Sequence, residues 1–255
     1  MTPVTVNATV LSRQAIATGA VEMVLEVGEG LDITFGQFAQ VHSPAQGVLL
    51  PRPISVADYV GDKLTLIIQP KGEGTQALCK MKAGDSTKVL LPLGKTFELP
   101  DTAREVWLVG GGLGVAPLYY AARRWAGQGR TVRTFAGYRG AEFAYYQEQF
   151  SAFGGLDIAT DDGGLGTKGY VHELVLAAMA QGEPDAVVSC GPTPMIRALQ
   201  GAMAGFPHIP AWVSMEQRMA CGYGVCRVCV CKTKSGAYPR VCADGPVFPL
   251  AEVEV

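Results

Sequence analysis

The cysteines near the C-terminus have a spacing that suits a two-iron cluster. They follow the pattern C-x4-C-x2-C-x12-C and are Cys221, Cys226, Cys229 and Cys242. This is the ligand pattern of a plant-type [2Fe–2S] centre, in which four thiolates converge on two irons. Gly222 and Gly224 favour a tight loop there, because glycine adopts positive φ without steric cost and leaves amide groups free to face sulfur. The pattern therefore predicts one-electron chemistry.

Zinc binding and disulfide bonding are the alternatives for these cysteines. Structural zinc sites usually pair two C-x2-C knuckles, whereas only Cys226 and Cys229 form such a knuckle here. Disulfide frameworks are typical of exported proteins, and the N-terminal residues show no export signal. Cys231 competes for a ligand position, because it lies two residues after Cys229 on the same face of an apparent strand. We favour Cys242, because a distant loop closes the cage better, and the roles of Cys231 and Cys79 stay open.

Composition excludes several classes of protein. The chain has 255 residues, a formal net charge of −2 and 48% hydrophobic residues, which suits two domains with a short appendage. Near-neutral charge without a basic run argues against nucleic-acid binding. The sequence contains no apolar run of about 18 residues that would cross a membrane. We therefore expect a cytoplasmic protein, in which reduced cysteines favour a metal or redox site.

Residues 1–100 are expected to form an antiparallel β-barrel domain. Apolar residues alternate with polar ones at residues 4–10, 21–27 and 64–68, as in half-buried strands. Gly, Pro and Asp interrupt these stretches at intervals of about 10 residues, which is typical of short strands joined by turns. One short helix is expected at residues 74–81.

Residues 101–210 are expected to form a parallel α/β domain. Strands are predicted at residues 105–109, 131–136, 157–160 and 186–189. Helices are predicted at residues 115–125, 142–150, 171–180 and 195–204. Alternating strands and helices build a parallel sheet. The remaining segment, residues 211–255, is too small for a sizeable core and should depend on its cluster and on packing against the two domains.

Two loops of the α/β domain are candidates for a dinucleotide site. The first joins its first strand and helix, and its glycines are Gly110, Gly111, Gly112 and Gly114. Backbone amides and the helix dipole favour an anion at such a loop, although a tight strand-to-helix turn also explains it. The second loop is Cys190, Gly191 and Pro192. Ligands of open α/β sheets bind where such loops meet, whereas Arg139 alone does not decide between NAD and NADP.

Two stretches of the barrel domain suit a flavin nucleotide. The first is Arg52-Pro53-Ile54-Ser55, in which the proline favours an extended backbone. An arginine can pair with a pyrophosphate, and a serine hydroxyl can hydrogen-bond a flavin ring, but surface Arg-Pro pairs are common. The second stretch contains Gly74 and Thr75, which open the short predicted helix. Their amides suit phosphate, and a plain turn capped by the threonine explains them equally well.

Together these motifs resemble the ferredoxin–NADP reductase superfamily. In that superfamily Arg-Pro-x-Ser binds FAD, a Gly-Gly-Gly-x-Gly loop binds a nicotinamide dinucleotide, and Cys-Gly-Pro lies beside the nicotinamide. The stretch from Met215 to Cys229, with Val241-Cys242-x-Asp-Gly-Pro-Val-Phe248, resembles the electron-transfer subunits of dihydroorotate dehydrogenase B more specifically. The resemblance covers nearly the whole chain.

The resemblance implies FAD, one [2Fe–2S] cluster and NAD⁺ as the electron acceptor. It also implies an FMN-containing catalytic subunit that oxidises dihydroorotate to orotate in pyrimidine biosynthesis, in a heterotetramer of two copies of each chain. It places FAD against Arg52–Ser55, against Ile67, Ile68 and Gln69, and against Gly74 and Thr75. Gln69 stands where an aromatic or basic residue is expected. No catalytic acid or base is expected, because electrons pass from the cluster to FAD and leave as hydride.

Two other functions fit the same sequence. The first is the small subunit of an NADH-dependent ferredoxin–NADP⁺ oxidoreductase or of a sulfide dehydrogenase, which shares these motifs. The second belongs to another class: a zinc-stabilised binding module without redox activity, which would be colourless.

Overall fold

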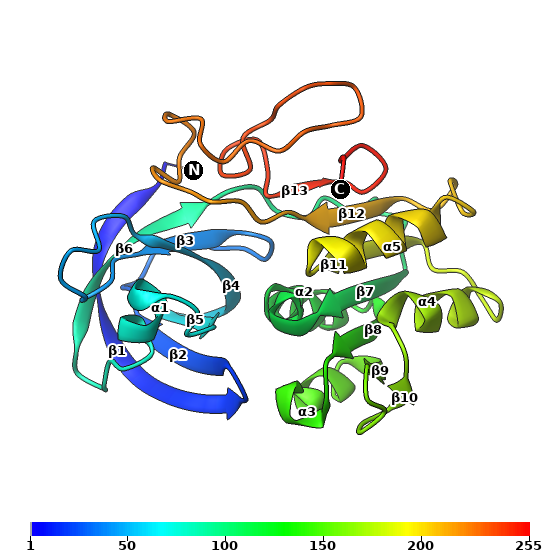
Figure 1. Cartoon of the computed structure of the whole chain (residues 1–255), viewed down its shortest axis with the longest axis horizontal. Helices are drawn as coiled ribbons and strands as arrows, with labels where there is room; N and C mark the ends of the chain where they lie inside the picture. The colour runs from blue at the N-terminus through cyan, green and yellow to red at the C-terminus, as the bar shows by residue number, and fades with distance from the viewer. Residues whose placement is uncertain (1) are drawn as a thin grey trace.

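The N-terminal part of the chain, up to Leu93, forms a closed antiparallel barrel. The computed structural model describes residues 2–255, and the barrel stands beside a second sheet with a loop-rich segment above both (Figure 1). The strand order of the barrel is β1-β2-β5-β4-β3-β6. The strands are β1 (Val4–Ala17), β2 (Ala20–Glu26), β3 (Phe38–Val41), β4 (Arg52–Val60), β5 (Lys63–Ile68) and β6 (Ser86–Leu93), with helix α1 (Glu73–Leu78) before β6. The apolar residues of the alternating pattern point into the barrel and fill it; Met23, Leu25 and Leu66, for example, are fully buried.

The second sheet has the order β10-β9-β8-β7-β11-β12-β13 and is parallel except at the β12–β13 pair. Its strands are β7 (Glu105–Gly111), β8 (Thr131–Tyr138), β9 (Gly154–Thr160), β10 (Thr167–Lys168), β11 (Ala186–Cys190), β12 (Ala211–Ser214) and β13 (Val247–Pro249). Its helices are α2 (Ala116–Gly127), α3 (Gln147–Ser151), α4 (Val171–Met179) and α5 (Thr193–Met203), with 3-10 turns η1 (Gly112–Val115) and η2 (Ala141–Phe143). The predicted barrel and parallel α/β sheet are confirmed.

Strand β7 lies inside this sheet and is buried on both faces. Trp107 and Val109 belong to the core shared with α4 and α5, whereas Val106 and Leu108 belong to the core shared with α2. A strand covered on both faces is apolar throughout, which explains the continuous hydrophobic run in the sequence.

The prediction of one continuous helix at residues 142–150 is wrong, because the structure has two shorter helical segments there. The structure has η2 there, followed by α3, and Tyr146 before α3 has a left-handed backbone with φ of 58°. The Tyr146 hydroxyl donates a hydrogen bond to the Glu22 carboxylate of the barrel. This tertiary contact between the two domains accompanies the break in the helix.

Two further contacts between the barrel and the α/β domain help to fix their relative position. Arg123 of α2 forms an ion pair with Asp58 of β4 at 2.6 Å, and the Tyr120 hydroxyl donates to the Ile33 carbonyl at 3.0 Å. Both contacts come from the helix that follows the glycine loop. The barrel is therefore held against the end of the second sheet where that loop lies.

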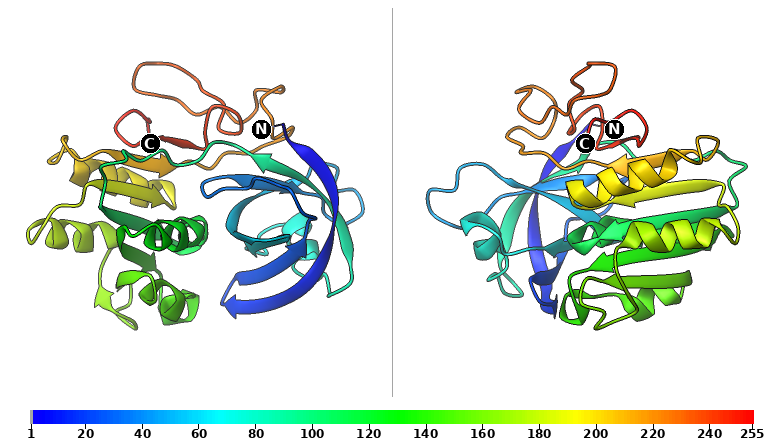
Figure 2. Two further views of the ribbon diagram at one scale, coloured as in Figure 1. Left: turned by 180° about the vertical axis from the view of Figure 1, so that it is seen from behind. Right: turned by 45° about the vertical axis from the view of Figure 1, so that its right-hand side comes forward.

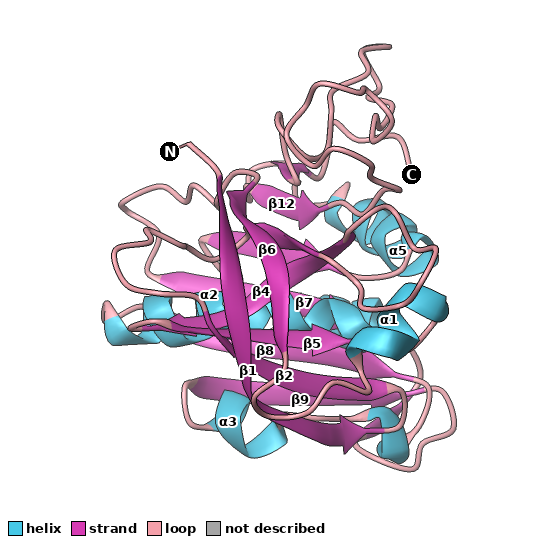
Figure 3. Cartoon of the chain, turned by 90° about the vertical axis from the view of Figure 1, so that its left-hand side faces the viewer, coloured by secondary structure: helices cyan, strands magenta, loops and turns pink. Residues whose placement is uncertain are grey.

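The cysteine-bearing segment is an excursion from the second sheet. Strands β12 and β13 pair with each other, and residues 215–246 between them contain no helix or strand, only isolated bridges between Val230 and Arg240 and between Thr233 and Val253. Figures 2 and 3 show these residues as loops standing above both sheets. The predicted division at residue 210 therefore falls just before β12, a strand of the α/β sheet. Across residues 2–255, every helix is too short or too polar to cross a membrane.

Candidate functional site

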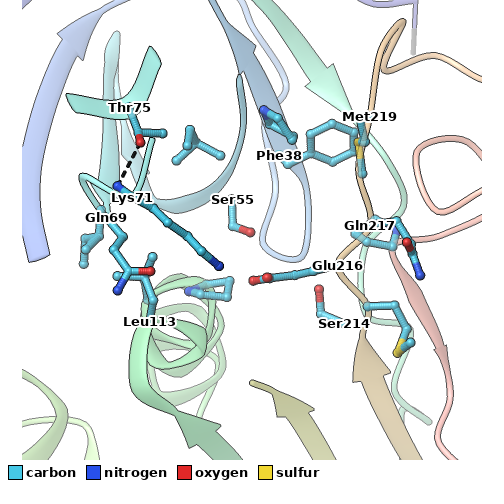
Figure 4. A pocket seen from close by; sticks show the side chains of 17 residues that line it. Phe38, Ser55, Gln69, Lys71, Thr75, Leu113, Ser214, Glu216, Gln217 and Met219 are labelled. Carbon is cyan, nitrogen blue, oxygen red and sulfur yellow. Dashed lines mark hydrogen bonds between the residues drawn. The ribbon is translucent and has the colours of Figure 1, made fainter. Parts of the chain in front are cut away.

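A cavity of about 220 Å³ lies where the barrel, the start of α2 and the end of β12 meet (Figure 4). The barrel lines it with Phe38, Pro53, Ile54, Ser55, Ile67, Gln69, Lys71 and Thr75. The opposite wall consists of Leu113, Ala116, Pro117, Ser214, Met215, Glu216, Gln217, Met219 and Pro246. The fold thus brings the Arg-Pro-Ile-Ser stretch and the glycine loop, which are far apart in sequence, to one site.

Arg52 is packed against the turn at Gly74. A Cβ atom on Gly74 would lie 2.5 Å from Arg52 Nε, so the arginine side chain lies directly against this glycine. Arg52 Nε is buried and has no hydrogen-bond partner within the chain. Since an unpaired buried donor is costly, this atom fits an anionic oxygen of a bound nucleotide. The predicted pyrophosphate contact is consistent with this geometry.

Thr75 closes its own turn. Its hydroxyl accepts hydrogen bonds from the Lys71 and Gly72 amides at 3.0 and 3.1 Å and donates to the Gly72 carbonyl at 3.0 Å. The Thr75 side chain therefore caps the turn, which is the alternative that the sequence left open beside phosphate binding. Any contribution of Gly74 and Thr75 to phosphate binding then comes from their backbone amides.

The side chains at the end of β5 and just beyond it alternate between the cavity and the barrel core. Ile67, Gln69 and Lys71 line the cavity, whereas Ile68 is fully buried in the barrel core. Successive residues of an extended chain point to opposite sides, so the Ile68 side chain faces away from the proposed flavin. Lys71 was missed in the sequence, although it follows Gln69 by two residues and the same alternation predicts it.

Glu216 is the second cavity residue that sequence reasoning missed. It follows β12, and Figure 4 shows Glu216 and Lys71 extending toward each other across the cavity, close to Ser55. Burial raises the pKa of the Glu216 carboxyl, and the Lys71 ammonium partly opposes this increase. The residue lies inside the motif that carries the family resemblance, but its type alone gave no signal of a place beside the flavin.

A wider cavity of about 510 Å³ adjoins the first and is lined by both glycine-bearing loops. A Cβ atom on Gly114 would lie 2.4 Å from the Cys190 carbonyl oxygen, so the two loops are in direct contact. Gly191 and Pro192 line the cavity, as do Gln69 and Glu216. This arrangement suits a nicotinamide brought against a flavin.

Gly110 and Cys190 do not line this cavity but pack behind the two loops that do. A Cβ atom on Gly110 would lie 2.7 Å from a methyl group of Val115, which shows how closely β7 and η1 pack. Cys190 is 1% exposed, and burial, with a smaller effect of Glu216, raises the pKa of its thiol. The thiol therefore remains protonated and contributes packing rather than charge.

A third cavity of about 490 Å³ lies at the carboxyl ends of β7, β8 and β9. Gly111 and Gly112 connect it to the nicotinamide side, and Arg139, Asp161 and His172 form part of its wall. Open α/β sheets bind dinucleotides at this edge. Arg139 is thus placed where the adenosine end of a dinucleotide would lie.

The four predicted cluster ligands form two pairs. The Cys226 amide donates to Cys221 Sγ at 3.5 Å, and the Cys242 amide donates to Cys229 Sγ at 3.4 Å. Cys229 and Cys242 are buried, whereas Cys226 is exposed. A plant-type [2Fe–2S] centre takes two thiolates at each iron, so the two pairs suit such a cluster.

The loop between Cys221 and Cys226 is built to stabilise a thiolate. Gly222 and Gly224 have φ of 80° and 92°, the left-handed backbone that the sequence predicted. Burial by itself raises the pKa of Cys221, but hydrogen bonds from the Cys226, Tyr223 and Val225 amides outweigh it, so that the pKa falls to about 6. Thiolates are the form that binds iron.

The two remaining candidate cysteines differ in position. Cys231 is buried in the core beside Cys229, where burial raises the pKa of its thiol. Cys79 lies in the barrel core and its thiol donates to the Ile68 carbonyl at 3.8 Å. Cys79 therefore belongs to a different core from the cysteine pairs.

Comparison with known proteins agrees with this geometry. Residues 216–254 match the family described as the iron–sulfur cluster binding domain of dihydroorotate dehydrogenase B. The fold is similar to that of an NADH-dependent reduced ferredoxin–NADP oxidoreductase, with a TM-score of 0.86 and 27% identity over 97% of this chain and 89% of that one. It is also similar to the Amycolatopsis cytochrome P450 reductase GcoB, with a TM-score of 0.71 and 25% identity over 81% and 67% of the two chains. The fold and site define an oxidoreductase of the ferredoxin reductase type.

Two relatives match along nearly their whole length. The dihydroorotate dehydrogenase B (NAD(+)) electron transfer subunit of Shouchella clausii is 38% identical over 255 residues, and that of Bacillus pumilus is 40% identical over 254 residues. In both cases 96% of each chain is covered. The chain therefore belongs to the family of dihydroorotate dehydrogenase B (NAD(+)) electron transfer subunits.

Proposed function

We propose that this chain passes electrons from a [2Fe–2S] cluster through FAD to NAD⁺, as the electron-transfer subunit of a dihydroorotate dehydrogenase. One observation carries the proposal: Met219 lines the cavity between the barrel and the α/β domain, and Cys221 follows it by two residues. The wall of the cavity and the first cluster ligand are thus one residue apart in the chain, and Leu113 of the glycine loop lines the same wall.

The residues around the cavity have separate tasks in this proposal. FAD exchanges single electrons and also delivers a hydride, which is the chemistry that joins a cluster to a nicotinamide. Arg52 binds the pyrophosphate, and Ser55 orients the flavin ring. The loops at Gly114 and Gly191 hold the nicotinamide against that ring. No side chain is assigned as a catalytic acid or base, and the four cysteines hold the two irons in the pairs described above.

The proposed partner is an FMN-containing catalytic subunit that oxidises dihydroorotate in pyrimidine biosynthesis, in a cytoplasmic heterotetramer of two copies of each chain. An apolar surface around the exposed cysteine supports a docking role. Tyr223, Val225 and Val228 are 54%, 74% and 54% exposed, and they follow Cys221 within one loop. Exposed apolar groups of this kind mark interaction sites.

The main alternative is a subunit of an NADH-dependent reduced ferredoxin–NADP oxidoreductase. The close structural similarity to that enzyme over 97% of this chain favours it as the second candidate. The two functions use the same cavity and cysteines, and they differ in the protein that exchanges electrons with the cluster.

The decisive experiment is anaerobic purification of the chain together with the proteins that bind it. We expect FAD, two irons and two acid-labile sulfides per chain, and a visible spectrum that bleaches with NADH. The co-purified complex should reduce NAD⁺ with dihydroorotate. Transfer only with reduced ferredoxin would support the alternative, and a colourless, zinc-containing protein would exclude both.

A further inference from the structure

Arg240 lies at the point where the two cysteine pairs are joined. Its backbone bridges Val230 in an antiparallel arrangement, and the Val241 amide donates to the Cys229 carbonyl at 2.8 Å. These contacts place Arg240 beside the buried pair, Cys229 and Cys242. The side chain reaches the loop of the other pair at Gly224.

The guanidinium group of Arg240 connects the turn after Cys242 to the loop of the other pair. Nε and Nη2 each donate to the Asp244 carboxylate at 2.9 Å, and the Arg240 amide donates to the same carboxylate at 2.8 Å. Nη1 donates to the Gly224 carbonyl at 3.0 Å. Gly224 lies between Cys221 and Cys226, so one planar side chain joins both halves of the cysteine site.

Gly224 is shaped to accept this contact. A Cβ atom there would lie 2.8 Å from the Ala243 Cβ atom and 3.1 Å from Arg240 Nη1. The φ of 92° at this position adds to the requirement for glycine. The loop of the first pair is therefore fitted to the turn that follows the second pair.

Arg240 also brings a positive charge close to the cysteines. Arg240 lies two residues before Cys242, and its guanidinium contacts the backbone of the loop between Cys221 and Cys226. Asp244 lies two residues after Cys242 and supplies a compensating negative charge through its two hydrogen bonds from the guanidinium. The two side chains are 34% and 38% exposed, so solvent weakens their effect without removing it.

We propose that Arg240 is a positioning residue that holds the Cys221–Cys226 loop and sets the reduction potential of the cluster, with Asp244 balancing its charge. The inference rests on the proposed [2Fe–2S] function. A positive charge near a cluster favours the reduced state, because reduction adds a negative charge. A negative charge at the same place opposes reduction.

The test compares two substitutions that remove opposite charges from one ion pair. Arg240→Gln should lower the midpoint potential of the cluster in the full chain, whereas Asp244→Asn should raise it. The potential is measured by anaerobic redox titration followed by electron paramagnetic resonance. Arg133→Gln and Asp157→Asn are matched controls, since this pair in the second sheet is 33% and 36% exposed with an N–O distance of 2.8 Å. Both controls should leave the potential unchanged.

Arg240→Lys separates the charge from the hydrogen bonds. It should keep the potential close to that of the unmodified chain but lose iron faster during dialysis, because lysine lacks the fork that spans Asp244 and Gly224. Shifts in the same direction for Arg240→Gln and Asp244→Asn, or shifts no larger than those of the controls, would overturn the inference. Absence of iron and sulfide from the unmodified chain would instead refute the proposed function.

Discussion

The flavin cavity and the cysteine site differ in what holds them in place. Most of the cavity wall comes from the barrel, the start of α2 and the end of β12, with a smaller part from the cysteine-bearing segment, and a direct ion pair between Arg123 and Asp58 joins the two domains. The cysteine site lies within residues 215–246, which contain no helix or strand. The cavity is therefore expected to persist without a ligand, whereas the cysteine site depends on its irons and on a few side-chain contacts. Two neighbouring redox sites of one chain can thus differ in what stabilises them: regular secondary structure at the cavity, and the bound cluster at the cysteines.

The strongest test of this contrast removes one cysteine. Cys226→Ser should abolish the cluster, because each iron needs both thiolates of its pair, while FAD remains bound in the cavity. Iron and acid-labile sulfide should fall to background, and NADH should still bleach the flavin. Cys79→Ser is the control and should keep the cluster, since Cys79 lies in the barrel core. A full cluster spectrum in Cys226→Ser would contradict the ligand assignment.

The next largest effect is expected at the pyrophosphate contact. Arg52→Ala should weaken FAD binding about 10- to 100-fold, because a hydrogen bond from a charged group contributes about 1.5–3 kcal/mol. Flavin retention during dilution measures this loss, and the iron content should not change. Arg13→Ala is a suitable control, since Arg13 also lies in the barrel but donates to the Cys79 carbonyl instead. Equal FAD affinity in the two variants would argue against the role of Arg52.

A smaller effect is expected where the two nucleotide loops touch. Gly114→Ala should lower the free energy of unfolding by about 1–3 kcal/mol and raise the KM for NADH, because its methyl group would meet the Cys190 carbonyl. Gly127→Ala tests the same substitution at a position with no atom within 4 Å. It should stabilise helix α2 slightly. If both variants oxidise NADH alike, close contact between the loops is not required.

The smallest predicted effect is a pH dependence at Glu216. Burial raises the pKa of this carboxyl in the folded chain above its unfolded value of about 4.3, so the folded state binds the proton more tightly. The stability linked to this proton is complete below the unfolded pKa and is lost as the pH rises through the folded pKa.

Glu216→Gln removes this loss. At about pH 4 the Tm of the variant should equal that of the unmodified chain. At about pH 8 the Tm of the variant should be the higher of the two. Glu26→Gln is an exposed control on β2. A constant Tm difference for Glu216→Gln at every pH would show that the proton on Glu216 is not linked to folding.

The sequence predicts much of the fold because its patterns are local. Alternating residues such as Met23 and Leu25 predict the barrel, and the apolar run around Leu108 predicts a buried strand. The break at Tyr146 was not predictable, because it accompanies a contact with Glu22 of another domain. Strand β13 has only three residues, Val247–Pro249, and it depends on its pairing with β12.

The site is predictable where one short motif contains it. The cysteine spacing and the two loops of the α/β domain are read directly from the sequence, and the structure brings those two loops together. Lys71 and Glu216 were missed because their proximity arises only when the barrel and the second sheet meet. The Arg240–Asp244 contact was missed for a different reason: an arginine four residues before an aspartate is common on protein surfaces, and its meaning depends on Gly224.

The excursion between β12 and β13 has a mechanical consequence. Both of its ends are anchored in adjacent strands of the α/β sheet, and its loops also contact the barrel: the Gln40 side-chain amide donates to the Ala220 carbonyl at 3.5 Å, and the Lys95 amide donates to the Gly245 carbonyl at 2.7 Å. The segment is therefore a second tie between the two large domains, beside the Arg123–Asp58 ion pair. A rotation of the barrel against the sheet would have to break these contacts, so the cysteine-bearing loops oppose such a movement.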